Sequence, residues 1–562
     1  MSNQDFDAIV VGSGISGGWA AKELTEKGLK VLLIERGRSI TPEDYVGEHK
    51  ADWEFPFRNL GDRHLYARDY PIQRTCYAFG EATEQFFVGD SAHPYGQDAE
   101  NPFSWIRGYH LGGRSITWGR VTPRLGPINF TENAEDGHGV DWPIRYEDIQ
   151  PWYDHVERFI GVSGQSDYDA PTAPIGRFQP GMPLNRCEAH VADGIAKTYP
   201  DRRLMIAPSA ILTQDLGDRA ACHYCGPCQR GCSTGSYFSS ISSTLPAAQA
   251  TGNLTIVTDA IVEGLDHDPK AGKVSGVRVI DANKGTRTTY RGRIVFLNAS
   301  TLGSTQILLN STSEEYPDGL GNKSGVLGHY LMDHLMTGGA FGLVPGMLDS
   351  PPIGNRPAGL YMPRFRNVAK KDAPFLRGYG LQGAAARANW TRGAMTPGFG
   401  APLKQSLREP GPWFIYIAGF GECLPYYNNR LSLDPQKKDK WGIPILNTRF
   451  EGGANEKLMA EDISKEAVAM LTAGGALGVQ AIRTAIPPGG LAIHEMGTAR
   501  MGRDPKTSYL NGFNQSHEVA NLFVTDGACM ASTAAQNPSL TYMALTARAA
   551  NHAVERMKAG QL

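Results

Sequence analysis

The 562-residue sequence predicts an α/β fold in which a parallel-sheet domain is joined to a domain with an antiparallel sheet. A strand, a glycine turn, a helix and a second strand follow one another within residues 7–35, and a further strand–turn–helix spans residues 294–309. Residues 340–480 contain strand-like segments at 414–420, 430–433 and 445–448, which Pro, Asn and Gly separate. These last segments predict the antiparallel sheet, which would form a wall of a binding site.

Residues 7–35 read DAIVVGSGISGGWAAKELTEKGLKVLLIE, which is a complete Rossmann-like dinucleotide-binding unit. Gly12 makes the tight turn, Gly14 lets the backbone approach a pyrophosphate, and Gly17 lets helix and strand pack closely. The helix, expected from Trp19 onward, presents its free N–H groups to the phosphates. Glu35 ends the second strand, where an acid holds a ribose hydroxyl and disfavours the 2′-phosphate of NADP.

Composition excludes several classes of function. The 55 basic and 57 acidic residues give a net charge of −2, which favours neither nucleic acid nor an anionic membrane surface as a partner. No apolar run reaches about 18 residues, so no membrane-spanning helix is expected. Only five residues precede the first strand, which leaves no room for a signal peptide and predicts a cytoplasmic location from this chain alone.

Two other loops are rich in small residues. Residues 107–119 read RGYHLGGRSITWG, which suits a backbone lying against a flat ligand, although an ordinary turn fits equally well. Residues 298–305 form a second small-residue turn after a buried strand and before a helix expected at 306–309. Together with the first turn, it predicts a two-part cradle for a cofactor.

Four of the eight cysteines lie within 11 residues, at Cys222, Cys225, Cys228 and Cys232. This C-x2-C-x2-C-x3-C spacing is typical of the bacterial ferredoxin run that binds an iron–sulfur cluster. Structural zinc and disulfides are the alternatives, but zinc usually takes ligand pairs from separate turns, and nothing marks the chain as secreted. In ferredoxins the fourth cysteine ligates a second cluster. Cys232 therefore either closes the same cluster, or only three thiolates bind.

The C-terminal segment carries the remaining chemistry. Residues 493–502 read IHEMGTARMG, and residues 521–528 form a strand that ends on an acid followed by small residues. The last helix begins at Pro538, which removes an N–H that would be unpaired anyway and leaves other donors free for a ligand. Taken alone, His494 is more often a packed or surface histidine than a catalytic base.

Together these motifs resemble those of the glucose–methanol–choline (GMC) oxidoreductase family. The resemblance rests on the loop at 12–17 with Glu35, GGRSITW at 112–118, HEMGTARMG at 494–502, VTDGACM at 524–530 and QNPSLTYMAL at 536–545. It is strongest to the pyranose oxidase branch and to flavin sugar dehydrogenases that carry an iron–sulfur cluster. It implies the two-domain fold shared with p-hydroxybenzoate hydroxylase, and FAD rather than NAD.

The resemblance also implies roles for individual residues. His494 matches the active-site base that takes the hydroxyl proton, and Asn537 matches the second polar residue that holds the substrate oxygen. The position of the histidine that bonds flavin covalently in pyranose oxidases is Thr117, so FAD should be bound non-covalently. The expected cofactor-binding residues are Gly12, Ser13, Gly14, Gly17, Glu35, Arg36, Gly112, Gly113, Ser115, Thr117, Trp118, Val262, Ala299, Asp526, Gly527, Asn537, Pro538 and Ser539.

The implied activity is FAD-dependent oxidation of a secondary hydroxyl of a pyranose or glucoside. Attack at C3 would give a 3-ketosugar, as in the glucoside 3-dehydrogenases, with electrons leaving through a 3Fe-4S or 4Fe-4S cluster. The alternatives are a sugar or alcohol oxidase that uses O2, a C1 glucose dehydrogenase, and a flavin subunit that only relays electrons. Expected partners are a small subunit and a c-type cytochrome, and co-export with that subunit would allow a periplasmic site.

The expected FAD-binding domain is discontinuous. It comprises residues 1–40, 100–125, 210–335 and 485–562, and includes the cysteine loop at 222–232. Residues 41–99, 126–209 and 336–484 would form the substrate domain and covering segments. Gln382, Glu422 and Asn447 are candidates for the substrate wall, with a purely structural role as the alternative for each.

Overall fold

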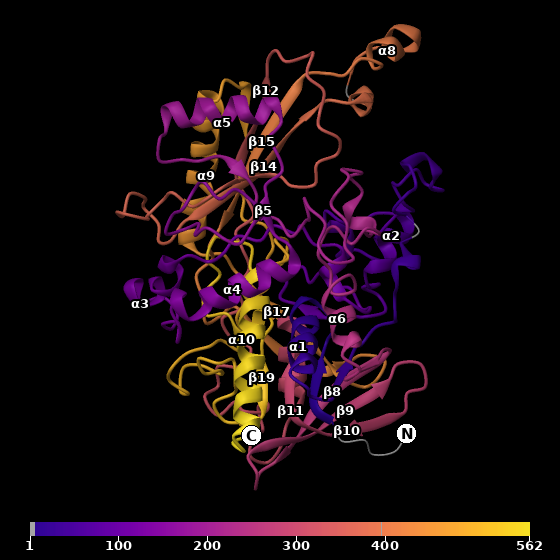
Figure 1. Ribbon diagram of the computed structural model, residues 1–562, viewed down its shortest axis with the longest axis vertical. Helices are drawn as coiled ribbons and strands as arrows, with labels where there is room; N and C mark the ends of the chain where they lie inside the picture. The colour runs from indigo at the N-terminus through magenta and orange to yellow at the C-terminus, as the bar shows by residue number, and fades with distance from the viewer. Residues whose placement is uncertain (1–5, 46, 395) are drawn as a thin grey trace.

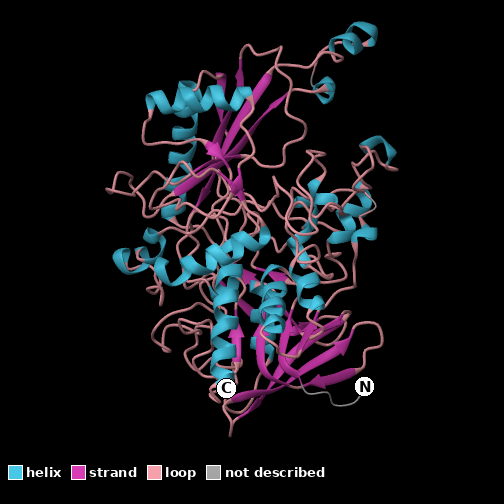
Figure 2. Cartoon of the chain, viewed as in Figure 1, coloured by secondary structure: helices cyan, strands magenta, loops and turns pink. Residues whose placement is uncertain are grey.

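The computed structural model describes residues 6–45, 47–394 and 396–562. Residues 1–5, on which the expectation about a signal peptide depends, lie outside this range. The fold is mixed α/β, with one large sheet at each end of the long axis (Figures 1 and 2). No helix in the described part of the chain has the length and apolar character needed to cross a membrane.

The lower sheet in Figure 1 is parallel and has the strand order β19-β11-β1-β2-β7. Its strands are β1 (Phe6–Val11), β2 (Val31–Ile34), β7 (Leu254–Val257), β11 (Gly292–Leu297) and β19 (Leu522–Val524). Helix α1 (Ile15–Glu26) joins β1 to β2 and begins earlier than expected. Gly17 therefore lies in its first turn, where a Cβ atom would come within 1.8 Å of the Gly12 carbonyl oxygen. This close approach explains why a glycine stands inside the helix.

A second, antiparallel sheet has the order β18-β12-β15-β14-β13-β6. Its strands are β6 (Met205–Ile206), β12 (Gly339–Val344), β13 (Leu360–Met362), β14 (Tyr379–Arg387), β15 (Trp413–Gly421) and β18 (Leu477–Ala481). Helices α5 (Arg186–Thr198) and α9 (Ala454–Ala473) pack on it through a shared apolar core. The antiparallel sheet expected within residues 340–480 is thus present.

Two segments expected in that sheet lie elsewhere. β16 (Arg430–Lys438) and β17 (Pro444–Arg449) pair with each other, and β17 pairs in parallel with β3 (Gly96–Gln97). The prediction of one continuous sheet was wrong here, because hydrogen bonding to β3 occupies the other edge of β17. Another small sheet is an antiparallel meander of β8 (Ala260–Asp268), β9 (Lys273–Asp281) and β10 (Arg287–Tyr290).

Four helices support the site. Helix α10 (Ser539–Lys558) packs beside α1 and against α4 (Tyr146–Ile160). Helix α4 is continuous through Pro151, because its buried side, including Tyr153, stays aligned on α10. The Tyr153 hydroxyl lies 2.8 Å from the Thr541 hydroxyl. Helix α7 (Thr301–Asn310) follows β11 and is longer than the expected 306–309.

The remaining elements are short. They are α2 (Arg63–Asp69), α3 (Glu132–Asp136), α6 (Thr244–Ala250), α8 (Gly400–Ser406), β4 (Ser163–Gly164) and β5 (Gln179–Pro180). Helix α4 falls within the residues 126–209 assigned above to the substrate domain and covering segments, and it packs in the same apolar core as β1. The N-terminal ends of α1 and α10 point toward the second sheet (Figure 1).

Candidate active site

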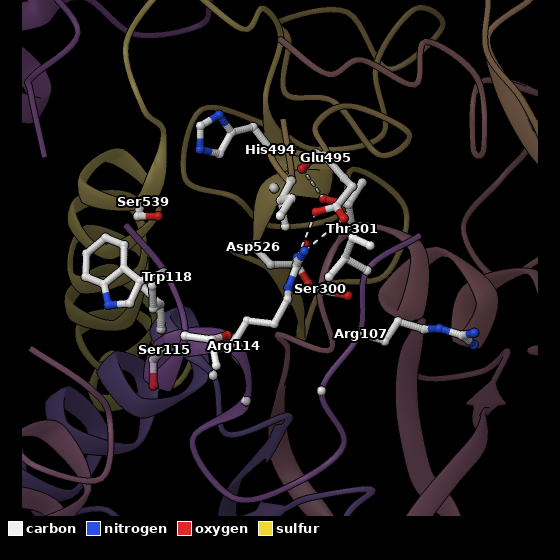
Figure 3. A pocket seen from close by; sticks show the side chains of 18 of the residues that line it. Arg107, Arg114, Ser115, Trp118, Ser300, Thr301, His494, Glu495, Asp526 and Ser539 are labelled. Atoms are coloured by element: carbon white, nitrogen blue, oxygen red, sulfur yellow. Dashed lines mark hydrogen bonds and ion pairs between the residues drawn. The ribbon is translucent and has the colours of Figure 1, made fainter. Parts of the chain in front are cut away.

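A cavity of about 760 Å³ lies between the two large sheets, a volume typical of a cofactor and substrate site. Its wall combines the glycine turn after β1 with residues of β14 and β15 from the second sheet. Figure 3 shows side chains that line it, among them Arg114, Trp118 and His494. Of the residues predicted from the sequence, the wall contains Gly12, Ser13, Gly14, Glu35, Arg36, Gly113, Ser115, Thr117, Trp118, Val262, Ala299, His494, Asp526, Gly527, Asn537, Pro538 and Ser539. Gly17 and Gly112 are not part of the wall, but they contact Gly12 and Ser13, which are.

The buried hydroxyl of Ser13 joins three of the predicted segments. It donates to the Glu35 carboxylate at 2.5 Å and accepts from the Gly112 amide at 2.9 Å. The Ser13 amide also donates to Glu35. Ser13 therefore holds together the glycine turn, the acid at the end of β2 and the 112–118 loop. Burial raises the pKa of Glu35, and these hydrogen bonds oppose that shift.

The cavity fits a bound dinucleotide. Helices α1 and α10 both begin on its wall, and neither N-terminus has a side-chain cap, so their first N–H groups remain available to an anion. A Cβ atom built on Gly14 would meet no protein atom within 4 Å, so the space beside this turn is open to a ligand. The buried Nε of Arg36 and Nδ2 of Asn298 have no hydrogen-bond partner within the protein. These donors and the open turn match an anionic nucleotide such as FAD.

His494 and Asn537 are neighbours on the cavity wall. The Asn537 amide nitrogen lies 3.5 Å from His494 Nε2, and the Asn537 oxygen accepts a 2.6 Å hydrogen bond from Gln382 on β14. Because Gln382 donates to the oxygen, the Asn537 NH2 group is the part that faces the histidine. The two chain segments predicted to form the reacting centre are thus side by side.

The ring of His494 is set among groups that disfavour its charged form. Burial, then the neighbouring His334 and the Arg114 guanidinium, hold the pKa of His494 well below its usual value of 6.5. His494 is therefore neutral at physiological pH, as a proton acceptor must be.

A partly buried ion pair links the flavin loop expected at 112–118 to the histidine loop. Arg114 binds Glu495 with two hydrogen bonds, of 2.9 and 2.7 Å, and Figure 3 shows this contact across the cavity. The Glu495 carbonyl accepts from Thr301 at the start of α7 at 2.6 Å. A paired, bidentate arrangement of this kind fixes geometry as well as charge. It ties the position of His494 to the predicted cofactor loop.

Sequence reasoning missed several wall residues. Arg114 lies within a predicted loop but carries no signal of its own, and Tyr416 and Phe420 alternate along β15 like any half-buried strand residues. His334 contacts His494 across 160 positions of sequence, and no local pattern marks it. Of the three candidates for the substrate wall, only Gln382 lines the cavity.

The other two candidates for the substrate wall are structural. Glu422 is buried in an ion pair with Arg377, at 2.6 Å. Asn447 lies on β17, where its amide donates to Asp434 at 3.3 Å. Both side chains lie outside the cavity wall, and each one binds a protein side chain there. For these two candidates the structural alternative is the one that their positions support.

The four cysteines of the 222–232 loop are free thiols. Three of them, Cys222, Cys228 and Cys232, pack against one small apolar cluster. Burial, assisted by charge repulsion from Cys222, Cys225 and Cys232, raises the pKa of Cys228 to about 11. Within the described residues, no group of three or more His, Cys, Asp or Glu side chains has an arrangement that could hold a metal ion. The loop in this form does not present a preformed metal site.

Family models for GMC oxidoreductase match residues 6–336 and 425–546, which together span most of the chain. The chain belongs to the GMC oxidoreductase family. It is accordingly an FAD-dependent oxidoreductase that acts on alcohol or sugar hydroxyls. The motifs at 12–17, 112–118 and 494–502 all fall within the matched regions.

Individual relatives of this GMC oxidoreductase act on different alcohols. The chain is 29% identical to 2-methyl-1,2-propanediol dehydrogenase of Mycolicibacterium austroafricanum, over 99% of this chain and 96% of that one. It is 24% identical to the fructose dehydrogenase large subunit of Gluconobacter japonicus, over the full length of both. Its fold is similar to pyridoxine 4-oxidase from Mesorbium loti, with a TM-score of 0.59, 16% identity, and coverage of 97% and 98%.

We expect the flavin of this GMC oxidoreductase to be releasable. Thr117 lines the cavity next to Trp118 and has no side chain able to form the bond that a histidine makes to flavin. Acid precipitation should therefore leave the yellow FAD in the supernatant. Flavin absorbance that stays with the precipitated polypeptide would contradict this prediction.

Proposed function

We propose that this GMC oxidoreductase oxidises a secondary hydroxyl of a pyranose or glucoside, with C3 as the carbon attacked. The observation that carries this proposal is the pairing of His494 and Asn537, 3.5 Å apart, on the wall of the cavity that also contains the open glycine turn. FAD, when bound there, supplies the acceptor for the hydride that leaves the carbinol carbon.

The protein's own groups account for substrate binding and proton removal. His494 is neutral and accepts the hydroxyl proton, which must leave as the carbon gives up its hydride. The Asn537 NH2 group donates to the substrate oxygen without competing for the proton. Gln382 fixes the orientation of that amide through its hydrogen bond to the Asn537 oxygen. An alcohol is thus oriented by donors and deprotonated by a single base.

The rest of the wall supports a sugar ring as the substrate. Tyr416 and Phe420 supply aromatic surface on the same face of the β14–β15 pair as Gln382. The Gln382 amide offers hydrogen bonds to further hydroxyls of the sugar. One apolar face with a few placed polar groups is the usual design of a small-molecule site. The similarity to a fructose dehydrogenase subunit also favours a sugar.

Product analysis by NMR tests the proposal. The holoenzyme is incubated with methyl glucoside, glucose and an artificial electron acceptor. The proposal predicts a 3-keto product from the glucoside. A glucoside has no free C1 hydroxyl, so turnover of glucose alone to a lactone would instead identify a C1 glucose dehydrogenase.

We further propose that electrons leave to an external acceptor and that the cysteine loop binds an iron–sulfur cluster. The support for a cluster is the C-x2-C-x2-C-x3-C spacing on one loop. Binding would require the thiols to be deprotonated and rearranged from their present positions. Iron and acid-labile sulfide in stoichiometric amounts are the expected result, and their absence would contradict it.

The nature of the acceptor has a separate test. We propose a c-type cytochrome reached with the help of a small subunit, and the similarity to a "large subunit" supports a multi-subunit enzyme. Sugar turnover should reduce a redox dye rapidly and give little peroxide. Stoichiometric peroxide would instead identify an oxidase.

The pH dependence of kcat/KM follows from the lowered pKa of His494. The base must be neutral to accept a proton, so kcat/KM rises with pH through the pKa of His494 and is constant above it. Burial raises the pKa of Asp333 to about 7, but its carboxylate contacts backbone N–H groups of the loop and not the ring. We expect kcat/KM on a glucoside to keep its plateau from pH 8 to below pH 6.5. A limb with its midpoint above pH 7 would contradict this.

A further inference from the structure

His334 lies directly behind His494, on the side of the ring that faces away from Asn537. His334 Nδ1 is 3.0 Å from His494 Nδ1, and His334 Nε2 is 2.9 Å from the Ala534 carbonyl oxygen. The His334 side chain is buried, with 4% of its surface exposed. Three segments that are far apart in sequence, around 334, 494 and 534, therefore form one short chain of contacts.

The protons in this chain can be placed by elimination. A carbonyl oxygen only accepts, so His334 Nε2 must carry the proton in its contact with Ala534. A neutral imidazole has one proton, which leaves His334 Nδ1 as an acceptor. His494 Nδ1 must then be the donor, and His494 Nε2 carries a lone pair that faces the Asn537 NH2 group. The neutral form is the relevant one, because burial lowers the pKa of His334 to about 4.

The opposite assignment fails at both ends. Placing the His334 proton on Nδ1 would set a lone pair of Nε2 against the Ala534 carbonyl. It would also require His494 Nδ1 to accept, and so put the His494 proton on Nε2, facing the Asn537 NH2 group. Two facing acceptors at Ala534 and two facing donors at Asn537 would then replace two hydrogen bonds. In a buried setting this is unfavourable.

The residue next to His334 holds the backbone of the same loop. The Asp333 carboxylate accepts from the His494 amide at 3.1 Å and from the Gly490 amide at 2.7 Å. An antiparallel bridge between Met332 and Met496 fixes the two segments in register. Asp333 therefore fixes the backbone of His494, and the adjacent His334 contacts its ring.

We propose that His334 is a positioning residue that holds His494 in the tautomer whose Nε2 lone pair faces the substrate. This proposal rests on the proposed function, in which His494 is the base. In that role the tautomer decides activity, because a histidine with its proton on Nε2 would present a donor, not an acceptor, to the substrate hydroxyl.

Two variants of nearly equal size separate positioning from packing. In His334→Asn, the side-chain oxygen takes the place of Nδ1 and accepts from His494 Nδ1. In His334→Leu, no acceptor remains. We expect the leucine variant to lose roughly 10- to 100-fold in kcat with little change in KM and full FAD content, and the asparagine variant to recover most of that loss. Equal activity of the two variants would overturn the proposal.

A second readout does not depend on turnover. In substrate-free holoenzyme labelled with 15N-histidine, the nitrogen shifts of His494 report which nitrogen carries the proton, and its signals are assigned by their loss in His494→Ala. We expect protonation at Nδ1 in the wild-type protein. Protonation at Nε2 overturns the proposal, even if the leucine variant does not fold. If His494 Nδ1 carries the proton but no sugar reduces the bound flavin, the proposal about His334 stands. That result would contradict the proposed function instead.

Discussion

Replacing His494 by alanine should lower kcat/KM for a glucoside by roughly 10²- to 10⁴-fold, the usual cost of losing a general base. The flavin should remain bound, because His494 contacts the reacting part of the cavity and not the glycine turn. The rate of flavin bleaching by sugar without oxygen measures the effect directly. The same comparison shows whether the chain oxidises sugar itself or only relays electrons as a flavin subunit.

A matched control is His552→Ala, which changes a histidine on α10 that stacks on Phe513 outside the cavity wall. This variant should bleach at the wild-type rate. If His494→Ala also bleaches at about that rate, His494 is not the base, and the assignment of its role from the GMC pattern fails.

The two glycines of the first turn should respond to alanine in opposite ways. Gly14→Ala places a methyl group in open space, with a backbone φ of −64° that alanine adopts readily, so the apoprotein should fold normally. That space is where the pyrophosphate is expected, and FAD affinity should fall at least about tenfold, or roughly 1.4 kcal/mol. Gly17→Ala instead drives Cβ into the Gly12 backbone, which costs about 1–3 kcal/mol or more in overpacking.

Melting of the apoprotein and titration with FAD separate the two effects. Gly17→Ala should melt well below the wild-type apoprotein, whereas Gly14→Ala should melt with it and bind FAD weakly. Wild-type FAD affinity in Gly14→Ala would mean that the phosphates do not lie against this turn.

The first domain was predictable because its signals are local. Residues 7–35 contain strand, turn, helix and acid in one run. Gly12 and Gly17 stand where the backbone of another residue comes too close for a Cβ atom, and Gly14 stands beside open space. The same holds for the turn before α7. The pairing of His494 with Asn537 came from the family resemblance. Neither residue carries a pattern that would identify it alone.

The rest of the site depends on contacts between distant segments. His334 and Arg114 become functional candidates only when folding brings them to residues 494 and 495. The position of β17 was missed for a similar reason, since its partner β3 is a two-residue strand more than 340 positions away. Pro151 illustrates the same limit, because a proline is a local signal for a helix break, whereas the packing of α4 on α10 that keeps this helix continuous involves distant residues.

The central claim is that the cavity holds FAD with His494 and Asn537 facing a sugar hydroxyl. Anaerobic mixing of the purified yellow protein with methyl glucoside deuterated at C3 tests it most directly. We expect the flavin band to bleach more slowly than with unlabelled sugar, and hardly at all in His494→Ala. A colourless folded protein, or bleaching that neither the deuterium nor the loss of the imidazole slows, would contradict it.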